Sequence, residues 1–200
     1  LRDILRLDPQ VEAAARVITL ANPDVLVLLG IDYDHDLAAL GAFADRVAAA
    51  GADYPHLFAL RPNTGRATGL DMDGDGRLGG PRDAQGYGRF AGEGGMAVLS
   101  RLPIDVAGVR DFSGLLWRDL PGAILPGDMA ADVLDAQRLS TTGHWEVPVR
   151  LAGGGTLRLL AWHASPPVFD GPEDRNGRRN HDEAAFWARL MEGALPYPAP

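Results

Sequence analysis

One glycine-rich stretch, residues 61–104, most limits what this chain can fold into. It reads RPNTGRATGLDMDGDGRLGGPRDAQGYGRFAGEGGMAVLSRLPI and contains an apolar run near its end, residues 96–99. A connection of this length with little regular structure is uncommon in a compact domain and usually has a function. Two interpretations compete for it: a loop that binds a cation, or the rim of an active site.

Before the glycine-rich stretch, helix and strand patterns alternate. Asp8 followed by Pro9 is typical of a helix start, and the apolar spacing continues that helix to about residue 21. The wholly apolar run at residues 25–29 predicts a central strand that is buried on both faces. A second helix over residues 37–51 and a short strand over residues 56–60 follow.

After the apolar run, the patterns favour strands. We expect strands at residues 96–100, 104–109, 145–149 and 156–163, and the last two form an antiparallel hairpin. Residues 111–137 show no clean period and predict irregular chain with one short helix. Asn180 followed by Glu183 has the spacing of a capping box, so the final helix should begin at Asn180. These patterns predict a single α/β domain over residues 1–200.

The composition excludes several kinds of protein. An apolar content of 46% suits a domain with a real core, and the lack of cysteine excludes disulfides, thiolate catalysis and cysteine-type zinc sites. No run approaches the roughly eighteen apolar residues that span a membrane. The net charge of -8 disfavours a protein that coats nucleic acid by charge alone. It leaves open an enzyme that cleaves phosphodiesters, because bound cations can supply positive charge.

Three aspartates at alternate positions, Asp71, Asp73 and Asp75, stand in the middle of the glycine-rich stretch. Alternating carboxylates in a tight turn aim their oxygens at one point and match the start of an EF-hand calcium loop. The match then fails, because the position of the bidentate glutamate is Arg82 and the nearest acid is Asp83. The alternating carboxylates still lead us to expect that Asp71, Asp73, Asp75 and Asp83 bind Ca²⁺. The alternative is a solvated Asp/Gly turn.

His163 is the main candidate for catalysis. It ends the last predicted strand and precedes a polar loop with several carboxylates and arginines. A histidine in this setting can act as a general acid or base or bind a phosphoryl oxygen, and the alternative is that it only bonds to a loop carbonyl. Arg175 and Arg178 are candidates for binding a substrate phosphate, whereas His144 is expected to be structural.

Five segments carry a resemblance to a known family. They are PDVLVLLGIDYD (23–34), GYGRFAGEGGMAVLSRLPI (86–104), LLWRDLPGA (115–123), RLSTTGHWEVPV (138–149) and LLAWHASPPVFDGPEDRNGRRNHDE (159–183). Together, and in this order, they resemble the endonuclease/exonuclease/phosphatase family, which includes pancreatic deoxyribonuclease, apurinic endonucleases and sphingomyelinases. They are most similar to a bacterial, often exported branch. The resemblance implies a four-layer αββα sandwich of two mixed sheets covered by helices, with the active site at one edge of both sheets.

The resemblance also implies a reaction. His163 takes the place of the family's catalytic histidine, which contacts the scissile phosphate or protonates the leaving group. The implied activity is metal-dependent hydrolysis of a phosphoester by an activated water, with Mg²⁺ as the cofactor. The partner would be a phosphoester substrate, with nucleic acid disfavoured by the net charge, and we expect an exported monomer.

The chain departs from the family pattern at the metal site. The family's metal-binding glutamate falls at Gly30, and Asp32 is the nearest carboxylate. The family's early asparagine strand would precede Leu1, and its Gly-Asp-x-Asn and Ser-Asp-His motifs would follow Pro200, so we expect a partial domain that lacks some terminal strands. Two functions therefore remain: a phosphoesterase impaired at Gly30, or a non-catalytic, calcium-stabilised binding domain of the same fold.

Overall fold

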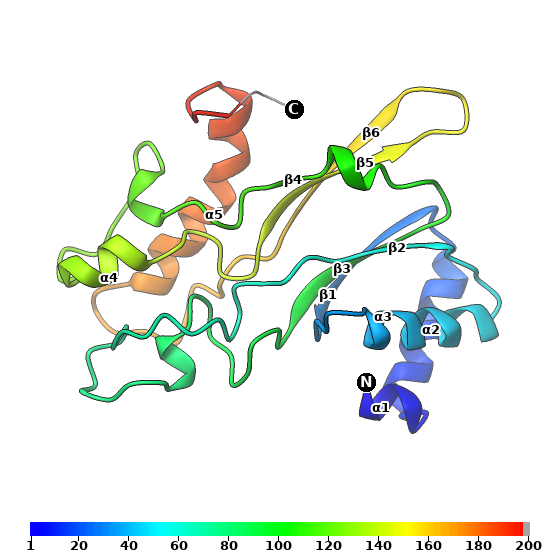
Figure 1. Cartoon of the computed structure of the whole chain (residues 1–200), viewed down its shortest axis with the longest axis horizontal. Coiled ribbons are helices and arrows are strands. Elements are labelled where there is room, and N and C mark those ends of the chain that lie inside the picture. Colours follow the sequence, from blue (N-terminus) through cyan, green and yellow to red (C-terminus); the bar gives the residue numbers. More distant parts are fainter. Residues whose placement is uncertain (198–200) are drawn as a thin grey trace.

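The computed structural model describes residues 1–197, which fold into two sheets with helices on their outer faces (Figure 1). The helices are α1 (Arg2–Leu5), α2 (Pro9–Ala21), α3 (Ala38–Ala49), α4 (Ala131–Ala136) and α5 (Arg175–Met191), with short 3₁₀ turns at Pro81–Asp83, Val106–Gly108 and Trp117–Asp119. One sheet has the strand order β1 (Val25–Ile31), β3 (Gly95–Ser100), β2 (His56–Phe58). The other has the order β4 (Arg110–Asp111), β5 (His144–Arg150), β6 (Thr156–Trp162).

Strand β3 joins the layers because its two faces belong to two different cores. All of its residues are buried, and successive side chains point to opposite faces. Ala97 and Leu99 belong to the core that the first sheet forms with α1, α2 and α3. Met96 and Val98 belong to the core between the sheets and pack there with Trp145 of β5. With α5 packed beside the second sheet, the layers are helix, sheet, sheet and helix, and the predicted α/β sandwich is confirmed (Figure 1).

The described strand pairs are all antiparallel, where mixed sheets were expected. Strands β1 and β2 run in the same direction, but β3 lies between them and opposes both. Strand β1 is therefore at the edge of the described sheet, and its residues are half-buried or exposed. The prediction that residues 25–29 form a central strand buried on both faces is wrong, because that position belongs to β3.

The second sheet confirms the predicted hairpin and corrects a neighbouring strand. Strands β5 and β6 pair from His144 opposite Trp162 to Arg150 opposite Thr156. Residues 104–109, expected as a strand, contain a 3₁₀ turn, and only Ile104 forms a bridge to β5. With a single bridge, these residues form an irregular segment beside β5 instead of a strand.

The final helix begins earlier than the sequence predicted. Helix α5 starts at Arg175, so Asn180 and Glu183 lie inside it. Their side chains bond to Ser165 in the preceding loop instead of to the helix start. The capping-box interpretation is wrong because both side chains have tertiary partners.

The glycine-rich stretch is built into the domain and bridges its halves. The backbone N–H of Asn63 donates to the carbonyl oxygen of Thr142 at 2.8 Å, and its side-chain amide donates to the carbonyl of Ser140 at 2.8 Å. A Cβ atom on Gly86 would lie only 2.1 Å from the carbonyl oxygen of Thr141, so only glycine allows this approach. Part of the glycine content is therefore a packing requirement.

Candidate active site

Four strand ends meet at one edge of the sandwich. The end of β1 lies beside the beginning of β3, with Ile31 opposite Gly95. The end of β6 lies beside the beginning of β5, with Trp162 opposite His144. Both sheets therefore present one strand end and one strand start to the same loops.

Hydrogen bonds connect these two pairs of strand ends through the glycine-rich stretch. The N–H of Tyr33 donates to the carbonyl of Gly92 at 2.8 Å, and the N–H of Gly92 donates to the carbonyl of Thr64 at 3.1 Å. The residue before Thr64, Asn63, donates to Thr142, which lies two residues before β5. The residues that follow β1 and the residues that flank β5 and β6 thus form one continuous polar edge, which we call the strand-end edge.

His163 lies on the strand-end edge, directly after β6. Its ring nitrogen Nδ1 is buried and has no hydrogen-bond partner among residues 1–197. Its other nitrogen, Nε2, also bonds to no described residue but is not buried. Nε2 is therefore the ring nitrogen that keeps some exposed surface, and no carbonyl oxygen within residues 1–197 accepts a hydrogen bond from either nitrogen.

The opposite side of the strand-end edge lacks the implied metal ligand. Gly30 sits at a bulge in β1, where the pairing register shifts between Leu29 and Ile31, and its φ of 80° is in the region that favours glycine. Apart from its two chain neighbours, no residue within 1–197 places an atom within 4 Å of the position a Cβ would take, so none of these side chains fills the space. Leu29, 54% exposed, supplies no oxygen either.

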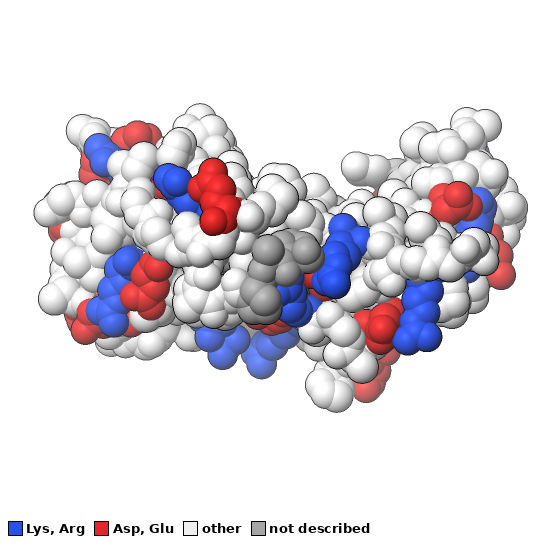
Figure 2. Space-filling model, turned by 90° about the horizontal axis from the view of Figure 1, so that it is seen from above, with Lys and Arg blue, Asp and Glu red and all other residues white. Residues whose placement is uncertain are grey.

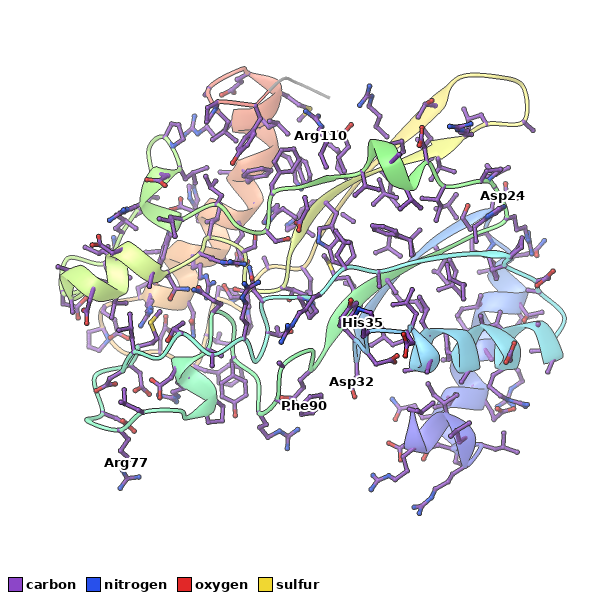
Figure 3. All side chains as sticks on the ribbon, viewed as in Figure 1. Asp24, Asp32, His35, Arg77, Phe90 and Arg110 are labelled. Atoms are coloured by element: carbon purple, nitrogen blue, oxygen red, sulfur yellow. The ribbon has the colours of Figure 1, made fainter. Side chains whose placement is uncertain are left out.

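Asp32, two residues after Gly30, is the nearest carboxylate in the sequence, and it already has a partner. It accepts a hydrogen bond from the N–H of Gly94 at 3.0 Å, and it projects from the segment after β1, near His35 (Figure 3). Mg²⁺ requires near-octahedral oxygen ligation, usually with at least one or two carboxylates. One bonded carboxylate beside Leu29 and Gly30 does not fit that ion, so the described residues do not form the family's Mg²⁺ site here.

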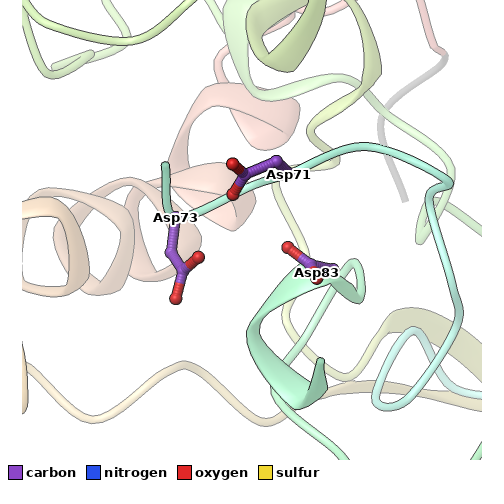
Figure 4. Close-up of side chains that lie close together, drawn as sticks. All are labelled: Asp71, Asp73 and Asp83. Carbon is purple, nitrogen blue, oxygen red and sulfur yellow. The ribbon is translucent and has the colours of Figure 1, made fainter. Parts of the chain in front are cut away.

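A different carboxylate cluster lies in the glycine-rich stretch. Asp71, Asp73 and Asp83 each place one oxygen within 4.8 Å of the others (Figure 4). Asp83 accepts hydrogen bonds from the N–H groups of Met72 and Gly80, and these two bonds lower the pKa of its carboxyl group. This cluster is negatively charged and could hold a metal ion.

The cluster differs in one member from the four aspartates proposed from the sequence. Asp75 lies outside the group, and its carboxylate accepts a hydrogen bond from the N–H of Arg77 at 2.8 Å. Asp71 closes the turn by accepting from the N–H groups of residues 74, 75 and 76. Asp73 has no such bond in the described chain, and its one ion pair there is with Arg82 at 3.8 Å.

The two arginines proposed to bind phosphate donate hydrogen bonds to other residues of the protein. Arg175 donates from Nη1 to the carbonyl of Met72 and from Nη2 to Oε1 of Gln137 at 2.6 Å. Arg178 donates from Nε to the carbonyl of Glu173 at 3.1 Å. Arg175 thereby ties the acidic turn to the start of α5.

Comparison with known proteins decides the family. The model of the Endonuclease/Exonuclease/phosphatase family matches residues 1–198. The chain belongs to this family. No curated protein and no solved structure is significantly similar to it. Members of the endonuclease/exonuclease/phosphatase family generally use divalent cations and act on phosphoester or nucleic acid substrates.

In this family member, α5 forms a buried polar network with the loops next to His163, and the sequence patterns did not predict it. Glu183 is fully buried and accepts hydrogen bonds from the N–H and hydroxyl of Ser165 and from the N–H of Thr141. Arg179, one turn earlier on α5, donates to backbone carbonyls of residues 85, 138 and 139. The sequence spacing indicates this burial, because the charged residues at 179 and 183 lie on the same helical face as the apolar Phe186 and Leu190.

The fully buried His144 should make the stability of this domain depend on pH. Its Nε2 donates to the carbonyl of Glu183 at 2.9 Å, its Nδ1 faces the hydroxyl of Ser140 at 2.7 Å, and burial lowers its pKa from 6.5 to about 4. The unfolded chain takes up this proton near its ordinary pKa, but the folded chain does so only near pH 4. The free energy of unfolding should therefore fall by about 3 kcal/mol as the pH drops from about 6.5 to about 4.

Denaturant unfolding at a series of pH values checks this prediction. His144→Gln removes the titrating group, so the difference between wild type and variant should shrink through that pH window. A difference that stays constant from pH 7 to pH 4 contradicts the prediction.

Proposed function

We propose that this domain binds a phosphoester at the strand-end edge and hydrolyses it with an activated water. The observation that supports this most is the place of His163, directly after β6 with Nε2 accessible, in a chain of this family. A protonated Nε2 can donate a hydrogen bond to a phosphoryl oxygen or give its proton to the leaving group. Asp32 and the N–H groups of the neighbouring loops supply further polar contacts at the same edge.

The proposed reaction is metal-dependent, with Mg²⁺ as the expected ion. Because Leu29 and Gly30 do not fit that ion, we assign no step to a cation held by these residues. The consequence is an impaired hydrolase, in which His163 contributes to phosphoryl binding and proton transfer. Arg178 remains a proposed phosphate contact through the part of its guanidinium not bonded to Glu173, and Arg175 is the weaker of the two candidates.

The substrate is proposed only as a class, a phosphoester. On the face shown in Figure 2, arginines lie next to carboxylates and form no continuous basic stripe. Together with the net charge of -8, this makes long nucleic acids less favourable than small phosphoesters. No helix within residues 1–197 has both the length and the apolar character to cross a membrane. A monomer that is exported fits the proposal.

A second candidate is a non-catalytic, calcium-stabilised binding domain. Two observations favour it: the glycine at position 30 and the three carboxylates of Asp71, Asp73 and Asp83. Ca²⁺ prefers oxygen ligands in flexible geometries, which suits this turn, and it would neutralise the repulsion among the three charges. In this alternative the ion stabilises the loop and takes no part in chemistry.

Turnover of bis-p-nitrophenyl phosphate with Mg²⁺, Mn²⁺ or Ca²⁺ tests the hydrolase. His163→Ala should lower the rate by about 10²-fold or more, the usual contribution of a positioned general acid. His56→Ala is the matched control, because His56 lies opposite Ser100, at the end of β3 away from the strand-end edge. Wild-type turnover that His163→Ala leaves intact would contradict the role of His163, and no turnover with any ion would favour the binding domain.

Calcium should raise the melting temperature through the carboxylate cluster. A ligand at a hundredfold excess over its Kd stabilises the folded state by about 2.7 kcal/mol. Asp73→Asn should abolish this effect, because Asp73 offers a ligand oxygen without a structural hydrogen bond to lose. Asp75→Asn should keep it, because Asp75 lies outside the cluster. An unchanged melting temperature at millimolar Ca²⁺, or equal losses in both variants, would rule out this site.

A further inference from the structure

We propose that Glu183 of α5 is the positioning residue for His163, because its carboxylate binds the backbone two residues after that histidine and its carbonyl is linked through His144 to the residue before it. The inference rests on the proposed function of His163 and adds to it the group that fixes the direction of the ring. Glu183 itself is fully buried and does not reach the substrate.

His163 needs such support because its own ring is not anchored. A catalytic histidine is commonly held by a carboxylate on the nitrogen that faces away from the substrate. In His163 that nitrogen is the buried Nδ1, which has no partner within the described residues. The ring direction must then come from the backbone of residues 162–165 and from packing.

The segment after His163 is fixed by α5. The N–H and the hydroxyl of Ser165 donate to Oε2 of Glu183 at 2.7 and 2.9 Å. The carbonyl of Ser165 accepts from the side-chain amide of Asn180 at 2.6 Å. All polar groups of Ser165, two residues beyond His163, are therefore bonded to one helix.

The residue before His163 is linked to the backbone carbonyl of Glu183 through the ring of His144. The carbonyl of Glu183 accepts from Nε2 of His144 at 2.9 Å. His144 is paired with Trp162 in the β5–β6 ladder, and the two rings are stacked with centroids 6.4 Å apart and planes 17° apart. Trp162 directly precedes His163, so the backbone carbonyl of Glu183 is linked to this residue through the ring of His144.

Besides the two bonds from Ser165, the carboxylate of Glu183 accepts a third hydrogen bond, which a glutamine could not keep together with the other two. Oε1 accepts from the N–H of Thr141 at 2.5 Å, so donors approach both oxygens of Glu183. A glutamine has one acceptor oxygen, and its NH₂ group would face a donor. Burial raises the pKa of Glu183, and the Arg179 charge and the three hydrogen bonds oppose that shift. A buried carboxylate is costly unless each oxygen is bonded, and here each one is.

The test compares Glu183→Gln with Asp182→Asn. Asp182 is the adjacent buried carboxylate, but it accepts from the indole of Trp117 and the N–H of Ile124, on a segment that does not lead to His163. Both changes remove the charge of one buried carboxylate from α5. Only Glu183→Gln should shift the His163 ring signals in ¹H–¹⁵N spectra.

Kinetics give the second readout. Misplacement of a catalytic group by about 1 Å can cost 10²-fold. Glu183→Gln should therefore lower kcat by up to about that factor with KM little changed, whereas Asp182→Asn should keep the wild-type kcat. Ser165→Ala, which removes only the hydroxyl bond, should shift the His163 signals in the same direction by less and serves if Glu183→Gln does not fold.

Three results would overturn the positioning role. They are unchanged His163 signals in folded Glu183→Gln, equal changes in Asp182→Asn, and full kcat in Glu183→Gln while His163→Ala is inactive. A wild type that shows no turnover, but whose His163 signals respond only to Glu183→Gln and Ser165→Ala, supports the positioning role and overturns the hydrolase proposal instead.

Discussion

The arrangement depends on the contact of β3 with both of its neighbouring layers. Met96 and Val98 pack against Trp145 of the second sheet, while Ala97 and Leu99 pack under the helices. This contact keeps the two sheets face to face and brings four strand ends to one edge. Without it, His163 and the segment after β1 would belong to unconnected halves of the molecule.

Polar groups then decide the shape of that edge. Asn63 joins the glycine-rich stretch to the loop before β5, and Glu183 joins α5 to the loops on either side of β5 and β6. Such loops carry function when rigid elements hold them. The edge is therefore densely hydrogen-bonded on the side of His163, whereas the glycine at position 30 contributes no side chain on the other side.

The sequence predicts local features well and tertiary ones poorly. Helix α2 follows from Asp8 and Pro9, because an N-cap and its partner are two residues apart. The apolar run of β1 could not reveal an edge position, since strand order depends on partners distant in the chain. The place of His163 after β6 was predictable from the hairpin. The roles of Arg175 and Glu183 were not, because Arg175 bonds to a carbonyl 103 residues away and Glu183 to loops 18 and 42 residues away.

The central claim is that a phosphoester binds at the strand-end edge, and a titration with dimethyl phosphate tests it most directly. Amide spectra of ¹⁵N-labelled protein, recorded with Ca²⁺ or Mg²⁺ present, report where this slowly hydrolysed diester binds. Binding at the strand-end edge should produce shifts clustered at residues 31–33, 92–95 and 163–165. Shifts confined to the acidic turn at residues 71–83, or none at saturating ligand, would contradict it.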